Sequence, residues 1–160
     1  MRTLLMTLFF VIPSLFINAQ TRSARLDGRV VKIIDGDTYD LLTADNQMYR
    51  IRMNGIDAPE KGQPFGQKAK EYLGQLCYKK NIRVQWYSKD RNGRYIADGY
   101  LTDGRSLSLE MIRAGYAWHF KKYSSDTVLS DAEIKARQNK TGLWSEPNPE
   151  APWDKRARRK

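Results

Sequence analysis

Four carboxylates in two short acidic segments are the side chains of this chain best suited to chemistry. Asp35 and Asp37 flank a glycine, and Asp57 and Glu60 flank an Ala-Pro pair. Carboxylate oxygens are the hard ligands that calcium and magnesium bind. Each segment alone is also typical of ordinary structure, because Asp-Gly-Asp forms turns and Pro-Glu begins helices. Their joint occurrence around one basic strand favours a divalent-metal site.

Two arginines could meet the phosphate of a nucleic acid. Arg52 lies between the acidic segments, and Arg94 closes the polar turn Arg-Asn-Gly-Arg. A guanidinium group presents a planar fork of donors that matches phosphate oxygens. Acids for a metal and arginines for a phosphate together predict metal-assisted chemistry on a phosphodiester.

Strand-like segments are expected to hold these side chains in place. Residues 27–43 are strand-like and broken by a tight turn at the first acidic segment, and residues 47–53 form the next strand. There Ile51 and Met53 alternate with Arg50 and Arg52. Because successive strand residues point to opposite faces, Arg52 can face a site while its neighbours fill a core.

The rest of the chain continues with short periodic segments. Helices are expected over residues 64–77, 106–115 and 127–139, and strands over 82–87 and 95–102. Short strands with a helix inserted between the third and fourth, and helices at the end, predict a small β-barrel that carries helices.

Both ends of the chain are expected to lie outside this domain. A single basic residue, an apolar stretch and a small residue at Ala19 predict a secretory signal peptide over residues 1–19, with an uncleaved membrane anchor as the alternative. A secreted or periplasmic location follows from the signal peptide. Residues 20–26 are expected to be a linker, 27–146 the domain, and 147–160 a Pro-rich basic tail without a packed core. Such a tail is either solubilising or a non-specific nucleic-acid arm.

Charge and cysteine content narrow the function further. The net charge is +10, and it becomes +9 without residues 1–19, which contain one arginine and no acid. A basic protein of this kind favours polyanions such as nucleic acid, anionic lipid or acidic glycan. Cys77 is the only cysteine, so the chain has no internal disulfide, and we expect this residue to be buried in the core.

Short segments in a fixed order along the chain carry a family resemblance. They are residues 34–38, Arg52, residues 57–60, Gly93, Arg94, residues 115–117, Tyr123 and residues 142–144. With this order and spacing, the chain resembles the staphylococcal nuclease (thermonuclease) family over residues 27–146. The resemblance implies an α+β, mainly β fold: an OB-like five-stranded β-barrel with three α-helices. It also implies a calcium-dependent nuclease that acts on DNA and RNA and leaves a 3′-phosphate.

The resemblance assigns the metal ligands. Asp37 and Asp57 would bind one Ca²⁺ through their carboxylates, and Ala58 would contribute its backbone carbonyl. Threonine is frequent in the family at the position of Ala58, but only the main-chain oxygen is needed there. Asp35 would accept a hydrogen bond from water at the metal, and Thr38 would support the site as a nearby polar group.

The resemblance also assigns the catalytic and substrate-binding residues. Glu60 would be the general base, and Arg52 and Arg94 would clamp the phosphate. Substrate contacts are expected from Arg91, Lys121, Lys122 and Tyr123. Lys121 and Lys122, together with Tyr116, Trp118 and His119, would form a cationic, aromatic rim for single strands. The chain departs from the family at Asn92, where a tyrosine is usual, so one aromatic contact to the nucleotide is not assigned. It also departs at Lys121, which replaces the usual companion of Tyr123.

Two other functions remain compatible with the sequence. One is a non-catalytic nucleic-acid-binding module of the OB type, and the other is a basic cell-envelope protein that binds acidic glycans. The complete set of Asp37, Asp57, Glu60, Arg52 and Arg94 favours the enzyme, because a binding module has no need of it. A domain of this size needs no partner, so a monomer is expected.

Overall fold

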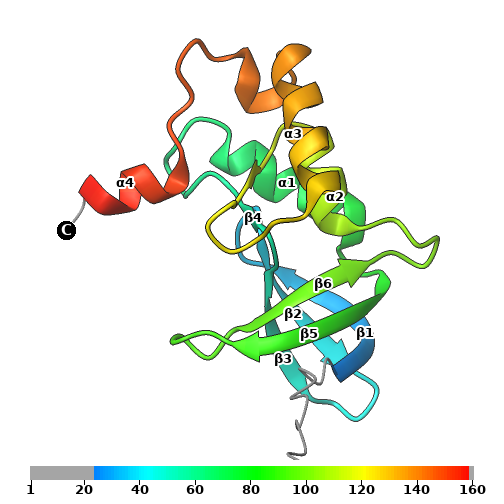
Figure 1. The fold of residues 1–160 in the computed structure, drawn as a ribbon. Helices are drawn as coiled ribbons and strands as arrows, with labels where there is room; N and C mark the ends of the chain where they lie inside the picture. Colours follow the sequence, from blue (N-terminus) through cyan, green and yellow to red (C-terminus); the bar gives the residue numbers. More distant parts are fainter. Residues whose placement is uncertain (1–23, 159–160) are drawn as a thin grey trace, which may run out of the picture.

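Five strands close into a barrel in the computed structural model, which describes residues 24–158 (Figure 1). Neighbouring strands run antiparallel except β3 and β6, which pair in parallel. In the order around the barrel, the strands are β1 (Ala24–Ile33), β2 (Thr38–Thr43), β3 (Met48–Met53), β6 (Tyr95–Tyr100) and β5 (Asn81–Lys89).

The alternation read from the sequence decides which side chains fill the barrel. On β3, Ile51 and Met53 are almost completely buried, whereas Arg50 and Arg52 point away from them. Arg52 pairs in register with Thr38 at the start of β2. The end of the barrel that carries the first acidic segment therefore also carries Arg52.

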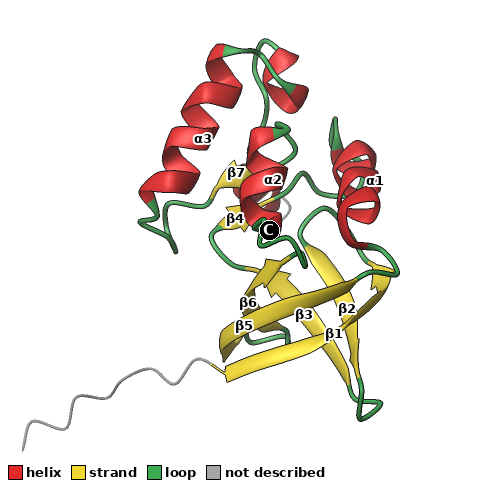
Figure 2. Ribbon diagram, turned by 90° about the vertical axis from the view of Figure 1, so that its right-hand side faces the viewer, coloured by secondary structure: helices red, strands yellow, loops and turns green. Residues whose placement is uncertain are grey.

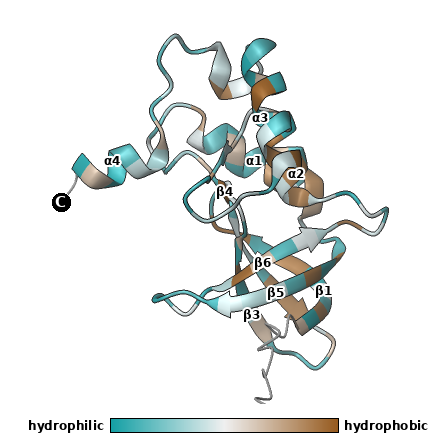
Figure 3. Ribbon diagram, in the orientation of Figure 1, coloured by the Kyte–Doolittle hydropathy of each residue, from teal (hydrophilic) through white to brown (hydrophobic). Residues whose placement is uncertain are grey.

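Three helices cover this end of the barrel, as Figure 2 shows. They are α1 (Gly66–Cys77), α2 (Leu107–Arg113) and α3 (Thr127–Gln138). The hydroxyl of Ser106 accepts a hydrogen bond from the Leu109 N–H and caps α2, and the Asp126 carboxylate caps α3 in the same way. Their apolar faces join the core of the barrel, and Figure 3 shows this in the brown residues of α2 and α3.

The predicted fold class is confirmed, but three short elements were not anticipated. Strand β4 (Ile56–Asp57) pairs with β7 (Trp118–His119), and this pair connects the second acidic segment to the chain after α2. A 3₁₀ turn, η1 (Gly142–Ser145), follows α3. Elements this short have no periodicity that a sequence pattern could reveal.

The ends of the described chain differ from the expected boundaries. Strand β1 begins at Ala24, so residues 24–26 belong to the barrel and not to a linker. Residues 147–160 were expected to be an unpacked tail, and this is wrong for residues 151–158. They contain a fourth helix, α4 (Pro152–Arg158), whose Trp153 ring stacks on Phe120 at 5.0 Å between ring centroids. The stacking of Trp153 on Phe120 holds this helix against the domain despite the prolines and basic residues around it.

Two further expectations concern the core and the N-terminus. Cys77 is fully buried as predicted, and burial raises the pKa of its thiol to about 12. The predicted signal peptide over residues 1–19 lies outside the described residues. No helix in residues 24–158 combines the length and apolar character needed to cross a membrane.

Candidate active site

The first acidic segment forms a tight loop between β1 and β2. Asp35 accepts a hydrogen bond from the backbone N–H of Asp37 at 3.1 Å. The glycine between them does not have a positive φ, so turn geometry does not explain it. A side chain at Gly36 would approach the Cβ atoms of Ala58 and Ala69 to 2.7 Å. Glycine is needed here because the loop packs directly against the second acidic segment and α1.

Asp37 connects the two acidic segments. Its Oδ2 accepts a hydrogen bond from the Ala58 N–H at 2.8 Å, and its Oδ1 accepts one from the Thr38 hydroxyl at 3.0 Å. Asp37 and Thr38 are both buried. Residues that lie 21 positions apart in sequence are thus held side by side.

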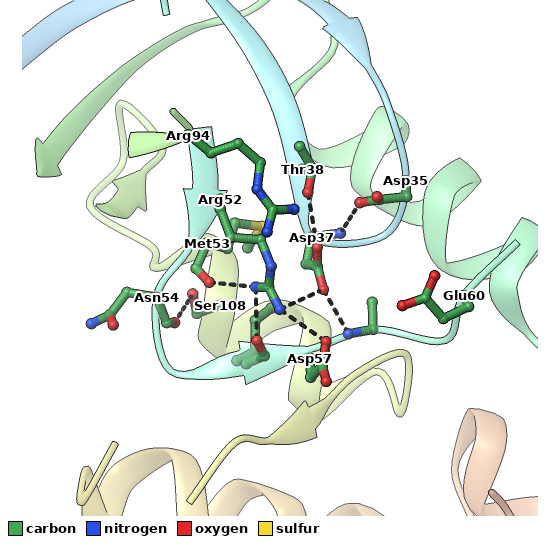
Figure 4. Close-up of polar contacts among 12 residues, drawn as sticks. Asp35, Asp37, Thr38, Arg52, Met53, Asn54, Asp57, Glu60, Arg94 and Ser108 are labelled. Carbon is green, nitrogen blue, oxygen red and sulfur yellow. Dashed lines mark hydrogen bonds and ion pairs between the residues drawn. The ribbon is translucent and has the colours of Figure 1, made fainter. Parts of the chain in front are cut away.

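Arg52 bridges the acids from the β3 side, as Figure 4 shows. Its Nη2 lies 3.2 Å from Asp37 Oδ2 and 2.9 Å from Asp57 Oδ1. Its Nη1 donates to the carbonyl oxygens of Met53 and Ile56. A guanidinium group fixed by four partners offsets the repulsion between two buried carboxylates.

Glu60 lies on a loop that the chain anchors in two ways. Its backbone N–H donates to Oε1 of the buried Gln63 at 2.7 Å, and Gln63 Nε2 donates to the carbonyl of Glu150. A Cβ at Gly66 would lie 2.4 Å from the Glu60 carbonyl oxygen, so only glycine fits there. The Glu60 side chain remains 32% exposed, whereas that of Asp57 is 2% exposed. Gln63 and Gly66 were not identified from the sequence, since both act on backbone atoms.

Arg94 lies at the end of the turn between β5 and β6. Its Nε and Nη2 both lie 2.8 Å from Asp90 Oδ2, and Asp90 Oδ1 accepts the N–H groups of Asn92 and Arg94. Burial alone would raise the pKa of Asp90, but these hydrogen bonds outweigh it and lower the pKa. Figure 4 shows Arg94 alongside Arg52. Asp90, which the sequence did not single out, therefore fixes both the turn and the side chain of Arg94.

The predicted substrate residues fall into two groups. Arg91 is exposed in the β5–β6 turn, whereas Lys121, Lys122 and Tyr123 are exposed after β7. Lys122 lies over the Tyr123 ring at 5.6 Å, and Lys121 pairs with Glu133 of α3 at 3.4 Å. Within the described part of the chain, no contact joins Arg91 to the second group.

The segment of β7 contributes packing and not a further catalytic group. His119 and Trp118 were expected at the cationic, aromatic rim, but both are buried. The ring nitrogens of His119 lie 2.9 Å from the Ser130 hydroxyl and 3.0 Å from the Ser124 hydroxyl. Trp118 is buried against Trp144 in the core.

Burial, and after it the charge of Asp37, disfavours the ionised forms of Asp35 and Asp57. Burial, followed by the charge of Asp37, raises the pKa of Asp35 to about 6. Burial and the charge of Asp37 also raise the pKa of Asp57, although Arg156 and Arg52 act in the opposite direction. A bound cation would relieve this repulsion.

A divalent cation fits this donor set only if main-chain oxygen and water complete its coordination. Among residues 24–158, no three His, Cys, Asp or Glu side chains form a group that could hold a metal. An ion here would depend on Asp37, Asp57, main-chain oxygen and water. Calcium tolerates such a mixed, irregular set of oxygen ligands.

One residue of the site was not predicted from the sequence. Arg156 of α4 places Nη2 2.5 Å from Asp57 Oδ2 and Nη1 2.6 Å from Glu60 Oε1. It thus contacts both a predicted metal ligand and the predicted general base.

Comparison with known proteins indicates an enzyme that hydrolyses phosphodiester bonds. Residues 50–146 match the family model described as "Staphylococcal nuclease homologue". The chain belongs to the staphylococcal nuclease family.

Three relatives illustrate the extent of the similarity. A protein named "Uncharacterized endonuclease" from Escherichia coli is 39% identical over 130 residues, which cover 81% of this chain and 84% of the relative. A protein of the same name from Haemophilus influenzae is 44% identical over 124 residues, covering 78% and 69% of the two chains. The "Micrococcal nuclease" of Shigella flexneri is 36% identical over 136 residues, covering 79% and 78%.

Proposed function

We propose that this protein is a calcium-dependent, sugar-non-specific endonuclease that hydrolyses phosphodiester bonds of DNA and RNA and leaves 3′-phosphates. The observation that carries the proposal is the joining of Asp37 and Asp57 by one guanidinium group, 2.9–3.2 Å from each carboxylate, beside the more exposed Glu60. The names of the relatives, endonuclease and micrococcal nuclease, support the same reaction.

The proposed metal ligands are the carboxylates of Asp37 and Asp57 and the carbonyl oxygen of Ala58. When bound, calcium supplies positive charge that stabilises the growing negative charge on the phosphate. The Thr38 hydroxyl holds one oxygen of Asp37, which leaves the carboxylate a fixed orientation. Asp35 would accept a hydrogen bond from water in the same site.

Glu60 is proposed to activate the attacking water. The water oxygen bonds to phosphorus, its proton passes to the Glu60 carboxylate, and the bond from phosphorus to the 5′ oxygen breaks. The leaving oxygen takes a proton from solvent, and the phosphate stays on the 3′ side. Gln63 holds the backbone of Glu60, so the carboxylate can approach the water without a large loss of conformational freedom.

Arg52 and Arg94 are proposed to hold the non-bridging phosphate oxygens. Each guanidinium group stabilises charge that is larger in the transition state than in the bound substrate, and removing one such donor typically costs about 10²–10³-fold in turnover. Arg94 is kept in position by Asp90. Arg52 would exchange part of its contact with the acids for contact with phosphate.

The exposed residues of the β5–β6 turn and of the segment after β7 are proposed to bind the nucleic acid. Arg91, Lys121 and Lys122 supply positive charge, and the 68% exposed Tyr123 offers a ring on which an unpaired base can stack. Stacking of this kind favours single-stranded regions. We further propose that the protein acts as a monomer and that residues 1–19 direct it to a secreted or periplasmic location.

The proposal is tested by incubating purified protein with plasmid, heat-denatured DNA and RNA, with calcium or with EGTA. We expect calcium-dependent degradation of all three, fastest on denatured DNA. Fragments should need phosphatase treatment before a polymerase can extend them. The Glu60→Gln protein, purified in parallel, controls for contaminating nuclease. Binding without degradation in calcium would instead indicate a non-catalytic nucleic-acid-binding module.

A further inference from the structure

The chain after η1 returns to the active site. In Figure 1 a long connection leads from this 3₁₀ turn to α4, drawn in red, at the C-terminal end of the described chain. Arg156 of this helix reaches Glu60 and Asp57, which precede it by 96 and 99 positions.

The contacts of Arg156 occupy the oxygens that the proposed reaction needs. Its Nη1 lies 2.6 Å from Glu60 Oε1, and its Nη2 lies 2.5 Å from Asp57 Oδ2. The other oxygen of Asp57 is engaged by Arg52 at 2.9 Å. With both oxygens bonded to guanidinium groups, Asp57 has no oxygen without a cationic partner.

The position of Arg156 is fixed by packing nearby. The Trp153 ring stacks on Phe120 with an interplanar angle of 5°, and its edge faces Trp118. Ala151 is buried in the same cluster. The carbonyl of Glu150 accepts a hydrogen bond from Gln63, the residue that holds the Glu60 backbone. Arg156 is therefore part of an anchored segment and not a loose surface side chain.

We propose that residues 146–158 form an autoinhibitory strap in which Arg156 competes with the divalent cation for Asp57 and with water for Glu60. This inference rests on the proposed function. A guanidinium group and an inner-sphere cation cannot occupy the same side of one carboxylate oxygen, so cation binding displaces Arg156. The apparent cation affinity is then reduced by the fraction of molecules in which the strap is closed.

The strap is suited to release. Helix α4 has seven residues, of which only Pro152 is buried, so its opening exposes less apolar surface than the opening of a core helix. The Arg156 side chain is 42% exposed, so solvent can receive the guanidinium group when it leaves. Nucleic acid and cation together would favour the open state, because phosphate offers the arginine a new partner.

The test measures calcium binding directly, by calorimetry on the full chain without nucleic acid. If the strap is closed in about nine molecules of ten, Arg156→Gln binds calcium about tenfold more tightly than the unaltered protein. Lys155→Gln is the matched control, because it removes the same charge from the same helix and has no described contact with the site. Its affinity should stay within about twofold. Trp153→Ala, which loosens the anchor while keeping Arg156, should shift affinity in the same direction as Arg156→Gln.

The outcomes separate this inference from the proposed function. Equal calcium affinity in Arg156→Gln, Lys155→Gln and the unaltered protein would overturn the strap and leave the metal site intact. Tighter binding by Arg156→Gln without any nucleic-acid hydrolysis would support the strap while rejecting the nuclease activity. Absence of calcium binding in every variant would reject both the strap and the metal site.

Discussion

At the scale of single residues, hydrogen bonds give the four carboxylates of the site different environments. Asp37 and Asp57 are buried and share Arg52, Asp35 holds the backbone of its own loop, and Glu60 remains accessible on a braced loop. The buried pair is suited to hold a cation, whereas an accessible carboxylate is suited to exchange a proton with water.

Replacing Glu60 by glutamine should therefore reduce turnover and spare binding. We expect kcat to fall about 10²–10⁴-fold, because the amide cannot accept the proton of the attacking water. Calcium affinity and substrate affinity, measured by calorimetry and by fluorescence anisotropy, should stay close to those of the unaltered protein. Glu71→Gln, an exposed change on α1, is the control. Unchanged turnover would exclude Glu60 as the base.

Asp90 should act on the reaction through Arg94. We expect Asp90→Asn to lower kcat about tenfold with a smaller change in KM, since the arginine loses its fixed orientation. Arg94→Ala should cost about 10²–10³-fold. In the double variant the Asp90 change should add almost nothing, because there is no longer a guanidinium group to position. Additive losses in this double-mutant cycle would assign Asp90 a role in folding alone.

His119 should titrate below the ordinary value of 6.5, because burial lowers its pKa more than the neighbouring Glu133 raises it. The stability that neutral His119 contributes is complete above the unfolded-state pKa and is lost as the pH falls through the lower pKa of the folded state. NMR titration of this single histidine measures the pKa without ambiguity. Urea unfolding between pH 7 and pH 5 should show a smaller pH dependence for His119→Gln. A folded-state pKa above 6.5 would reverse the sign.

At the scale of elements, the sequence predicted the helices and strands that have a clear hydrophobic period and missed the short elements that have none. The alternation in β3 and the apolar stripe of α1 were sufficient for their assignment. The pairing of β4 with β7 involves two residues from each strand, and α4 is a seven-residue helix whose Trp153 stacks on Phe120. Only tertiary contacts reveal such elements.

The site divides in the same way. The family resemblance identified side chains that act directly on metal or phosphate. Gln63 and Asp90 act instead on a backbone N–H or on another side chain, and Arg156 comes from a helix hidden in a basic, proline-rich run. Residue type does not reveal these roles, because each depends on a contact between distant or irregular segments.

Substitution by alanine should change the free energy of unfolding in opposite directions at Gly74, inside α1, and at Gly36, in the loop that packs on α1. Gly74 lies inside α1, and a Cβ there would meet only Ile33, at 3.9 Å, so Gly74→Ala should stabilise the fold by about 0.5–1 kcal/mol. A Cβ at Gly36 would lie 2.7 Å from both Ala58 and Ala69, so Gly36→Ala should destabilise it by about 1–3 kcal/mol. Urea unfolding measures both. A neutral Gly36→Ala would mean that the acidic loop can move off α1.

At the scale of the whole molecule, an acidic site lies within a strongly basic protein. The net charge of +10 attracts nucleic acid from a distance. At the site itself, Arg52 and Arg156 pair with the acids, so a cation that replaces Arg156 there should provide local attraction for phosphate. The long-range attraction of nucleic acid and its binding at the site can be separated experimentally, because they depend on different residues.

The salt dependence of substrate binding should separate them. In calcium, the catalytically impaired Glu60→Gln protein should bind a single-stranded oligonucleotide with an affinity that falls as salt rises. Three to five phosphate contacts predict a log–log slope of about −2 to −3.5 for single strands. Lys122→Gln should reduce the magnitude of this slope by about 0.7, the value for one contact, because Lys122 lies beside Tyr123 at the proposed rim. Arg25→Gln is the control, because it removes an equal charge near the start of β1. Arg25 lies eight positions before Ile33, the last residue of β1 before the acidic loop. This change should leave the slope unaltered. Equal effects of the two changes would mean that the strand binds over the barrel wall and not at the rim.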